Sequence, residues 1–433
     1  MTNKLFNLIK KITPTKWHSV LDHEGYKRYF TNMSWMFVGQ MFSLVVSFFI
    51  GAWIARYLGP ENYGVLSYSI AFVGLFGFIS SLGVDGILNR ELVKTPEKRD
   101  ELLGTTFRLK LIGGAIAFCL TIIGVLIFKT EPRVKILVAI FALSFILQSI
   151  NVVSTYFNAE VKSKNNVGAS IFSTIITSIL KIFIILSGKG IIWLVVVFVL
   201  DSVWQGIGLL KAYKSYGLKI ENWRFDKVLA KEILKNSWPL MLAGAAWLVS
   251  LKIDQVMIGS ILGNYEVGIY AAAVKLVEVW YFVPGIIGTA LLPAIINAKI
   301  TDENLYKKRL KNFYILMFVI PVFMAIPITL LAKPIIQILF GGGYLGSIPI
   351  LRIYIWSSVG IFLNYAVYHY LISNNLVKTI FVINFLSMII NIILNLIFIP
   401  IWGIAGSAWA TTISYSVVLV YILVIKKLGV SSF

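Results

Sequence analysis

The sequence has few of the residues on which disulfide-bonded, metal-binding and soluble proteins depend. Among its 433 residues there is one cysteine, Cys119, which excludes a disulfide framework. The three histidines are too scattered along the chain to predict a metal site, and no cofactor is expected. Charged residues make up 13% of the chain, about half the share that is typical of a soluble domain. A water-soluble globular protein is therefore excluded.

The chain also lacks sequence features of several catalytic classes. It has no G-x-x-x-x-G-K-[ST] phosphate-binding loop, so ATP hydrolysis through that motif is not expected. The longest predicted connection between apolar stretches runs only from Lys211 to Lys235. The longest loop on the other face, residues 333–347, holds one lysine and no acid or histidine. We therefore predict no extramembrane catalytic domain, and a protein that is not an enzyme.

Apolar residues are abundant, and they form long continuous runs. Hydrophobic residues make up 58% of the chain, and the mean hydropathy is +0.84. A membrane-spanning helix needs about 20 mostly apolar residues, and continuous runs favour helices over the alternating pattern of barrel strands. The sequence thus predicts an all-α integral membrane protein with twelve transmembrane helices. The predicted spans are residues 33–57, 64–88, 107–128, 134–156, 168–187, 190–211, 236–262, 267–295, 313–332, 348–372, 378–399 and 403–425.

The net charge of +20 is distributed unevenly across the predicted membrane. Of the 39 Lys and Arg residues, 29 fall on the face that carries the N-terminus, six on the opposite face and four within spans. Cytoplasmic loops carry such an excess of positive charge, so we predict a plasma (inner) membrane protein with both termini in the cytoplasm. Because the positive charge is explained by this orientation, nucleic acid is not an expected partner.

An internal repeat divides the spans into two halves. A shift of 204 residues aligns residues 32–90 with 236–294 without gaps, and ten of the 59 positions are identical. The paired glycines bracket the first turn of each half, LGPENYG and LGNYEVG. Six spans per half give parallel repeats, which in transporters enclose a substrate site between them. We predict two six-helix lobes with a substrate site between them, which is the architecture of a transporter.

The predicted layout has five parts. They are a basic cytoplasmic N-terminal segment (1–31), an N-terminal lobe (32–211), a cytoplasmic connector (212–235), a C-terminal lobe (236–425) and a cytoplasmic tail (426–433). The first segment has an amphipathic pattern that suits anionic lipid, and a disordered basic tail is an equal alternative.

Four charges lie inside the first hairpin of the second half, where an ionisable group is costly. Lys252 and Asp254 precede the turn glycine, and Lys275 and Glu278 follow it at similar depth. Two hypotheses remain open. The charges form two structural ion pairs across the hairpin, or the lysines bind an anionic substrate in a hydrated cavity while the acids exchange partners or protons.

Two further in-span charges are candidate site residues. Arg352 lies a few residues inside the outer end of its span, where it either extends to the interface or contacts a phosphate at the outer mouth. Asp201 lies near mid-span with no evident partner in the sequence, and we predict a role in the cavity.

Three stretches resemble a known family of membrane transporters. They are ARYLGPENYGVLSYSIAFVGLFGFISSLGVDGILNRELV (55–93), WPLMLAGAAWLVSLKIDQVMIGSILGNYEVGIYAAAVKLVE (238–278) and NIILNLIFIPIWGIAGSAWATTISY (391–415). In order and spacing they are similar to the polysaccharide-transporter flippases, of the O-antigen type, in the multidrug/oligosaccharidyl-lipid/polysaccharide exporter superfamily.

The resemblance implies two six-helix lobes around a central cavity that opens alternately to each side. It also implies a flippase that moves a polyprenyl-diphosphate-linked oligosaccharide from the cytoplasmic to the outer leaflet by this alternating access. Its partners would be this anionic lipid, the surrounding membrane lipids, and a proton or sodium gradient as the candidate driving force. Lys252, Lys275 and Arg352 would contact the substrate, and Asp254, Glu278 and Asp201 would be coupling or cavity acids. The alternatives are an ion-coupled multidrug exporter of the same fold and a polytopic glycan polymerase or ligase.

Overall fold

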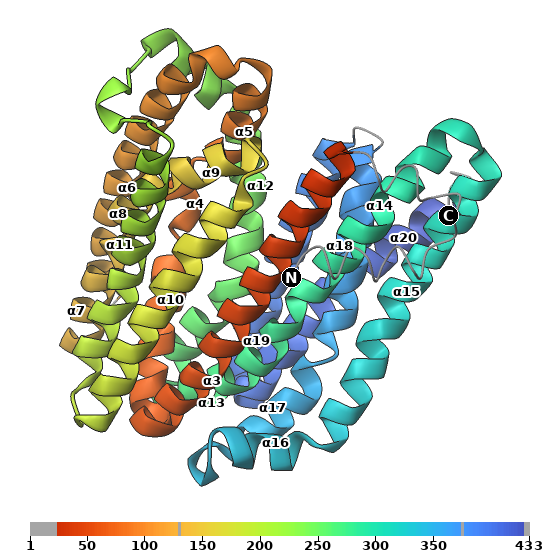
Figure 1. Ribbon diagram of the computed structural model, residues 1–433. Coiled ribbons are helices and arrows are strands. Elements are labelled where there is room, and N and C mark those ends of the chain that lie inside the picture. The colour runs from red at the N-terminus through yellow and green to blue at the C-terminus, as the bar shows by residue number, and fades with distance from the viewer. Residues whose placement is uncertain (1–23, 129–130, 374–375, 428–433) are drawn as a thin grey trace. The chain divides into compact units, whose positions relative to one another are not determined.

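A computed structural model describes residues 24–128, 131–373 and 376–427 (Figure 1). Most of the predicted N-terminal segment and of the C-terminal tail lies outside these residues. The helices of the first half are α3 (Glu24–Gly74), α4 (Gly77–Ser81), α5 (Val84–Lys94), η2 (Pro96–Lys98), α6 (Arg99–Phe128), α7 (Pro132–Ala142), α8 (Ser144–Leu147), η3 (Gln148–Asn151), α9 (Val152–Ala159), α10 (Ser163–Leu186), α11 (Ile191–Ser215) and η4 (Ile220–Asn222).

The second half is helical in the same way. Its helices are α12 (Lys227–Ile261), α13 (Asn264–Glu278), η5 (Val279–Phe282), α14 (Val283–Thr301), α15 (Glu303–Leu330), α16 (Ala332–Leu339), η6 (Gly342–Tyr344), α17 (Ser347–Tyr354), α18 (Ser357–Ser373), α19 (Val377–Tyr415) and α20 (Val417–Lys427). The described part of the chain contains no β-strand, which confirms the predicted all-α class.

Ten helical stretches among the described residues are long and apolar enough to cross a membrane. Two of them, of 44 and 45 residues, are too long for one crossing, because about 20 residues suffice. Each contains a glycine with left-handed backbone geometry, Gly59 (φ 68°) in α3 and Gly403 (φ 59°) in α19. Each long stretch is therefore two passes joined by a tight turn, in agreement with the twelve predicted spans.

Some predicted spans are less regular than the sequence indicates. The span predicted at residues 64–88 consists of the end of α3, the short α4 and the start of α5. Leu82 (φ 50°) and Gly83 (φ 65°) interrupt it. A Cβ atom on Gly83 would lie 2.7 Å from the backbone nitrogen of Met241, so a close backbone approach accompanies the break. Hydropathy detects the apolar run and is insensitive to such a break.

The chain divides into two compact units. Unit 1 comprises the described residues up to Ile50, together with 79–124 and 139–241. Unit 2 comprises residues 51–78, 125–138 and 242–433, as far as they are described. The hairpin around Gly59 thus groups with the second half of the chain. The lobes at residues 32–211 and 236–425 remain a prediction.

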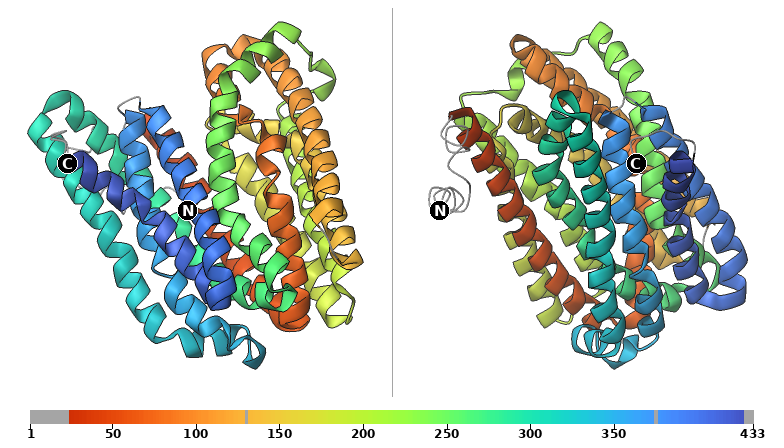
Figure 2. Two further views of the ribbon diagram at one scale, coloured as in Figure 1. Left: turned by 180° about the vertical axis from the view of Figure 1, so that it is seen from behind. Right: turned by 90° about the vertical axis from the view of Figure 1, so that its right-hand side faces the viewer.

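In unit 1, α10 and α11 lie side by side (Figure 2). A buried apolar cluster joins α5, α6, α9 and α11 at one end. Its members include Leu88, Leu102, Phe157 and Tyr213, all at most 1% exposed. Trp223 extends this cluster, because its Nε1 donates to the Tyr213 hydroxyl at 3.1 Å.

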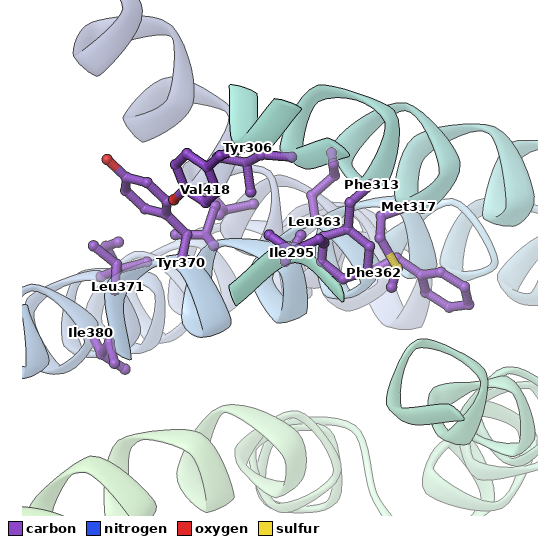
Figure 3. Close-up of a cluster of buried hydrophobic side chains, with 14 of the residues drawn as sticks. Ile295, Tyr306, Phe313, Met317, Phe362, Leu363, Tyr370, Leu371, Ile380 and Val418 are labelled. Atoms are coloured by element: carbon purple, nitrogen blue, oxygen red, sulfur yellow. The ribbon is translucent and has the colours of Figure 1, made fainter. Parts of the chain in front are cut away.

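In unit 2, α15 and α18 lie side by side, and α14 and α20 pack against them (Figure 2). Their apolar cluster includes Phe313 and Met317 from α15 and Phe362 from α18, all at most 1% exposed (Figure 3). Burying a Phe or Met side chain contributes about 1.5–3 kcal/mol relative to leaving it in water. In a bilayer the same close packing contributes mainly through van der Waals contact.

The two repeated hairpin turns, LGPENYG and LGNYEVG, meet within unit 2. A Cβ atom on Gly64 would lie 1.7 Å from the Asn264 carbonyl oxygen, and one on Gly268 would lie 1.9 Å from the Pro60 carbonyl oxygen. These two contacts are copies of each other under the 204-residue shift. The structure therefore supports the register of the repeat and explains why both positions are glycine.

Candidate functional site

The α12–α13 hairpin brings the predicted charges together. Gly263 between the helices has φ 99°, a conformation that glycine adopts readily and that permits the tight reversal. Across the hairpin, the Lys252 Nζ lies 3.1 Å from the Glu278 Oε1. Both side chains are partly exposed, at 24% and 31%. The ion pair expected from equal depth along the hairpin is therefore present.

Two glycines of α3 make room for the two lysines of this hairpin. A Cβ atom on Gly51 would lie 1.8 Å from the Lys275 Nζ, and one on Gly74 would lie 3.4 Å from the Lys252 Cγ. Any larger side chain at Gly51 would displace the end of Lys275. The two lysines of the hairpin thus pack against the glycine backbone of α3. All of these residues belong to unit 2.

Asp254 has a different environment from Lys252, although only two residues separate them on α12. Asp254 is 3% exposed and accepts hydrogen bonds from three neutral donors. These donors are the Tyr270 hydroxyl at 2.9 Å, the Asn395 amide at 2.8 Å and the Thr411 hydroxyl. They come from α13 and from both passes of α19. This neutral shell was not anticipated, and the role of Asp254 as a coupling or cavity acid stays a prediction.

Further oxygen atoms surround the Asp254 carboxylate. The Asn395 Nδ2 also donates to the Asn391 Oδ1 at 3.1 Å. The Asn395 Oδ1 and the Ser407 Oγ are enclosed and have no hydrogen-bond partner. Unpartnered buried polar atoms are rare in native proteins, and each requires an explanation. A buried carboxylate among neutral oxygens can hold a proton or a small hard cation. The described residues contain no group of three or more His, Cys, Asp or Glu side chains suited to a metal.

Arg352 lies on α17, and its contacts differ from those of the Lys252–Glu278 pair. Its side chain is exposed, and its Nε donates to the Thr329 carbonyl oxygen at the end of α15, at 3.3 Å. The Lys252 contact is with α13. The predicted contact of Arg352 with the substrate stays a prediction.

Asp201 belongs to unit 1 and has partners that the sequence did not reveal. Its Oδ1 accepts hydrogen bonds from the Ser173 hydroxyl at 2.6 Å and the Thr177 hydroxyl at 3.2 Å, both on α10. Lys181, one turn further along α10, lies with its Nζ 4.0 Å from the ring centroid of Phe198. The predicted role of Asp201 in the cavity also stays a prediction.

The sequence reading missed the neutral residues of the site. Asn391 and Asn395 are one helical turn apart in the predicted span 378–399, as are Ser407 and Thr411 in the next. Such i, i+4 polar pairs inside a span place their side chains on one face. This spacing could have indicated a shared polar cluster. Gly51 and Gly74 gave no comparable signal, because glycine is frequent in membrane helices.

A family model described as "Polysaccharide biosynthesis protein" matches residues 30–299. Among curated relatives, the "Putative O-antigen transporter" of Shigella flexneri is 25% identical over 356 residues, which are 77% of this chain and 81% of that protein. An uncharacterized membrane protein of Methanocaldococcus jannaschii is 30% identical over 205 residues, 46% of each chain.

Solved structures show a similar fold. The lipid II flippase MurJ in an inward closed conformation aligns with a TM-score of 0.72 at 19% identity, over 90% of this chain and 87% of that one. An inward-facing multidrug resistance transporter of the MATE family in the MOP superfamily aligns with a TM-score of 0.73 at 15% identity, over 93% and 98%. At these identities the likeness concerns the fold.

The match of the family model covers more than half of the chain. The relatives and structural neighbours with a stated activity are transporters and flippases, in agreement with the prediction that the protein is not an enzyme. The chain is a multi-pass membrane protein with the fold of MOP-superfamily transporters, and it belongs to the polysaccharide biosynthesis protein family.

Proposed function

We propose that the protein is a flippase that moves a polyprenyl-diphosphate-linked oligosaccharide from the cytoplasmic to the outer leaflet of the plasma membrane by alternating access. The observation that carries this proposal is the pair of membrane-embedded lysines, Lys252 and Lys275, held against glycines of α3 in unit 2. Family membership and the names of the Shigella flexneri relative and of MurJ support the same class of substrate.

The lysines meet the main physical requirement of such a substrate. A diphosphate is too costly to bring into hydrocarbon without compensating charge. Ammonium groups neutralise phosphate through charge-assisted hydrogen bonds, which are shorter and stronger than neutral ones. Lys252 retains partial exposure, so an anion can approach it without unfolding the hairpin.

Glu278 neutralises the charge of Lys252 when no substrate is bound. An unpaired charge at the bilayer centre costs at least about 2.5–3.5 kcal/mol on insertion scales. In the structure the Lys252–Glu278 ion pair reduces that cost. A diphosphate that replaces Glu278 as the partner of Lys252 would free the carboxylate to take up a proton. Substrate binding and protonation would then be linked at one hairpin.

Asp254 is the second coupling group of the proposal. Its carboxylate, with the unpartnered oxygens of Asn395 and Ser407 nearby, suits one proton or one sodium ion. The ligands come from α12, α13 and α19, so occupancy would change how these helices pack. The asymmetric positive charge supports cytoplasmic termini and thus export as the direction of transport.

The test is transbilayer movement of a polyprenyl-diphosphate-linked oligosaccharide in proteoliposomes. We expect the Lys252→Ala/Lys275→Ala variant to lose at least about tenfold in rate, because each charge-assisted contact contributes about 1.5–3 kcal/mol. Lys307→Ala is the matched control, since Lys307 forms an i, i+4 pair with Glu303 at 2.9 Å in which the glutamate is 76% exposed. We expect it to flip at the wild-type rate.

An exchange variant separates substrate binding from packing. Lys252→Glu/Glu278→Lys keeps an ion pair across the hairpin, so a purely structural pair would retain flipping. The proposal expects a folded variant with impaired flipping, because the cation has moved to the other helix. Failure of the wild type to flip any lipid-linked glycan under an imposed ion gradient would overturn the flippase proposal and favour the drug exporter.

A further inference from the structure

Helix α10 presents two opposite faces along its length. One face carries exposed apolar side chains: Phe172 (38%), Ile175 (44%), Ile179 (61%), Phe183 (61%) and Leu186 (73%). The other face carries polar side chains: Ser170, Ser173, Thr174, Thr177, Ser178 and Lys181. At 3.6 residues per turn the centres of the two sets are about half a turn apart. The exposed apolar side of α10 suits contact with lipid, and the polar side lies opposite it.

Burial divides this polar face into two parts with different roles. Ser173 and Thr177 are 2% and 1% exposed, and both donate to Asp201 of α11. Hydroxyl groups that bond across membrane helices in this way hold the helices together. The remaining four residues are partly exposed: Ser170, Thr174, Ser178 and Lys181. Packing accounts for the first pair and leaves the other four without a structural explanation.

The contacts of the partly exposed residues are weak. Ser170 and Thr174 each lie 3.5 Å from the Ser43 hydroxyl of α3, at the outer limit for a hydrogen bond. Lys181 lies over the Phe198 ring at 4.0 Å, and no carboxylate among the described residues pairs with it within 4.0 Å. Their donor and acceptor capacity is thus mostly unused in the structure.

Asp201 adds acceptor capacity beside these hydroxyls. Ser173 and Thr177 both donate to the same oxygen, Oδ1. No described residue donates to Oδ2. A carboxylate can accept about four hydrogen bonds in all. One oxygen is therefore held in place by α10, and the other is available to an external hydroxyl.

We propose that the partly exposed polar face of α10, with Asp201, binds the sugar hydroxyls of the transported oligosaccharide; this inference rests on the proposed flippase function. Serine and threonine hydroxyls donate and accept, as sugar hydroxyls do, so they can pair with either role.

Cysteine labelling tests the surface directly. In a Cys119→Ser background, Thr174→Cys and Ser178→Cys report on the polar face, and Ile175→Cys and Ile179→Cys are matched controls on the lipid face. We expect a water-soluble maleimide to label the first two in proteoliposomes and to spare the controls. The full glycan lipid, extracted from the producing cells, should slow labelling about tenfold, as expected for an occupied site at ten times its Kd. The same lipid trimmed to one sugar should not.

The outcomes separate this inference from the flippase proposal. Labelling that neither lipid slows, or that both slow equally, overturns a glycan surface on α10. An absence of labelling at both positions does the same, because the face is then dry helix packing. If wild-type flipping persists in either case, the flippase proposal stands. If the wild type flips nothing, both fail together.

A functional variant checks that the contact matters for transport. Thr174→Val/Ser178→Ala removes two hydroxyls while keeping similar volume, and Ile175→Val/Ile179→Val is its lipid-face control. We expect about a tenfold loss in flipping the full glycan lipid, the size expected from two lost hydrogen bonds, with the trimmed lipid unaffected. A loss of thermal stability that accompanies the loss of flipping would indicate a packing role for the two hydroxyls. An equal loss of flipping rate for both lipids would indicate the same.

Discussion

Two charges on one turn of α12 illustrate how burial separates roles at the residue scale. Lys252 and Asp254 are two positions apart, which on a helix directs them to different sides. Lys252 is partly exposed and pairs with a carboxylate, whereas Asp254 is 3% exposed and accepts hydrogen bonds from three neutral side chains. The first environment can exchange one anion for another. The second suits a group that binds and releases a proton or a small cation.

Asp254→Asn tests this second environment. The amide has nearly the shape of the carboxylate but carries no charge, so it cannot take up a proton or hold a cation in the same way. We expect the variant to flip substrate at a rate that no longer responds to an imposed proton or sodium gradient, whereas the wild type should respond to one of them. The measurement is flipping in proteoliposomes with and without each gradient.

The control for this experiment is thermal unfolding in detergent. Asn395 donates to the carboxylate in the wild type, so we expect a moderate loss of stability, about 1–3 kcal/mol for one unsatisfied group. A folded variant that still responds to the gradient would contradict the coupling role of Asp254.

The charged residues of this site could be predicted from the sequence, whereas their neutral partners could not. In-span ionisable residues are conspicuous because hydrocarbon penalises them, so Lys252, Asp254 and Glu278 could be selected by position alone. Asn395 and Thr411 reach Asp254 from 141 and 157 residues away. Such long-range contacts depend on how the helices pack, and local sequence does not encode that packing.

At the scale of elements, the paired hairpin turns are the most tightly fitted feature of unit 2. Gly64 and Gly268 each approach the backbone of the other hairpin, and Gly59 and Gly263 both have positive φ. The repeat could be found in the sequence because four equivalent glycines bracket the turns. The broken helix at Leu82 could not, since the apolar run continues through it.

Gly64→Ala should destabilise unit 2 through this fit. The new Cβ would lie 1.7 Å from the Asn264 carbonyl oxygen, and backbone on both sides leaves little freedom to adjust. Overpacking of this kind typically costs about 1–3 kcal/mol, so we expect a lower midpoint of thermal unfolding in detergent. Gly244→Ala in α12 is the control. It meets nothing within 4 Å, and we expect about 0.5–1 kcal/mol of stabilisation from reduced backbone entropy. Equal midpoints for the two variants would show that the hairpins do not approach so closely.

At the scale of the whole molecule, the distribution of positive charge predicts the orientation of the protein in the membrane. The count of 29 Lys and Arg on one face against six on the other is summed over short connections, where the positive-inside rule is most reliable. Helical boundaries in the structure agree with an even number of passes, because the two stretches of 44 and 45 residues each contain a turn glycine. An even number places both ends of the membrane domain on one side.

Single cysteines at two turns test this orientation. In a Cys119→Ser background, Lys189→Cys marks the turn between α10 and α11, and Lys219→Cys marks the connection between α11 and α12. We expect a membrane-impermeant maleimide to label the first in intact cells and the second only after the membrane is opened. The reverse result would place the basic face outside. The direction of the proposed flipping would then be inward, because the same fold and the same lysines would receive their substrate from the other leaflet.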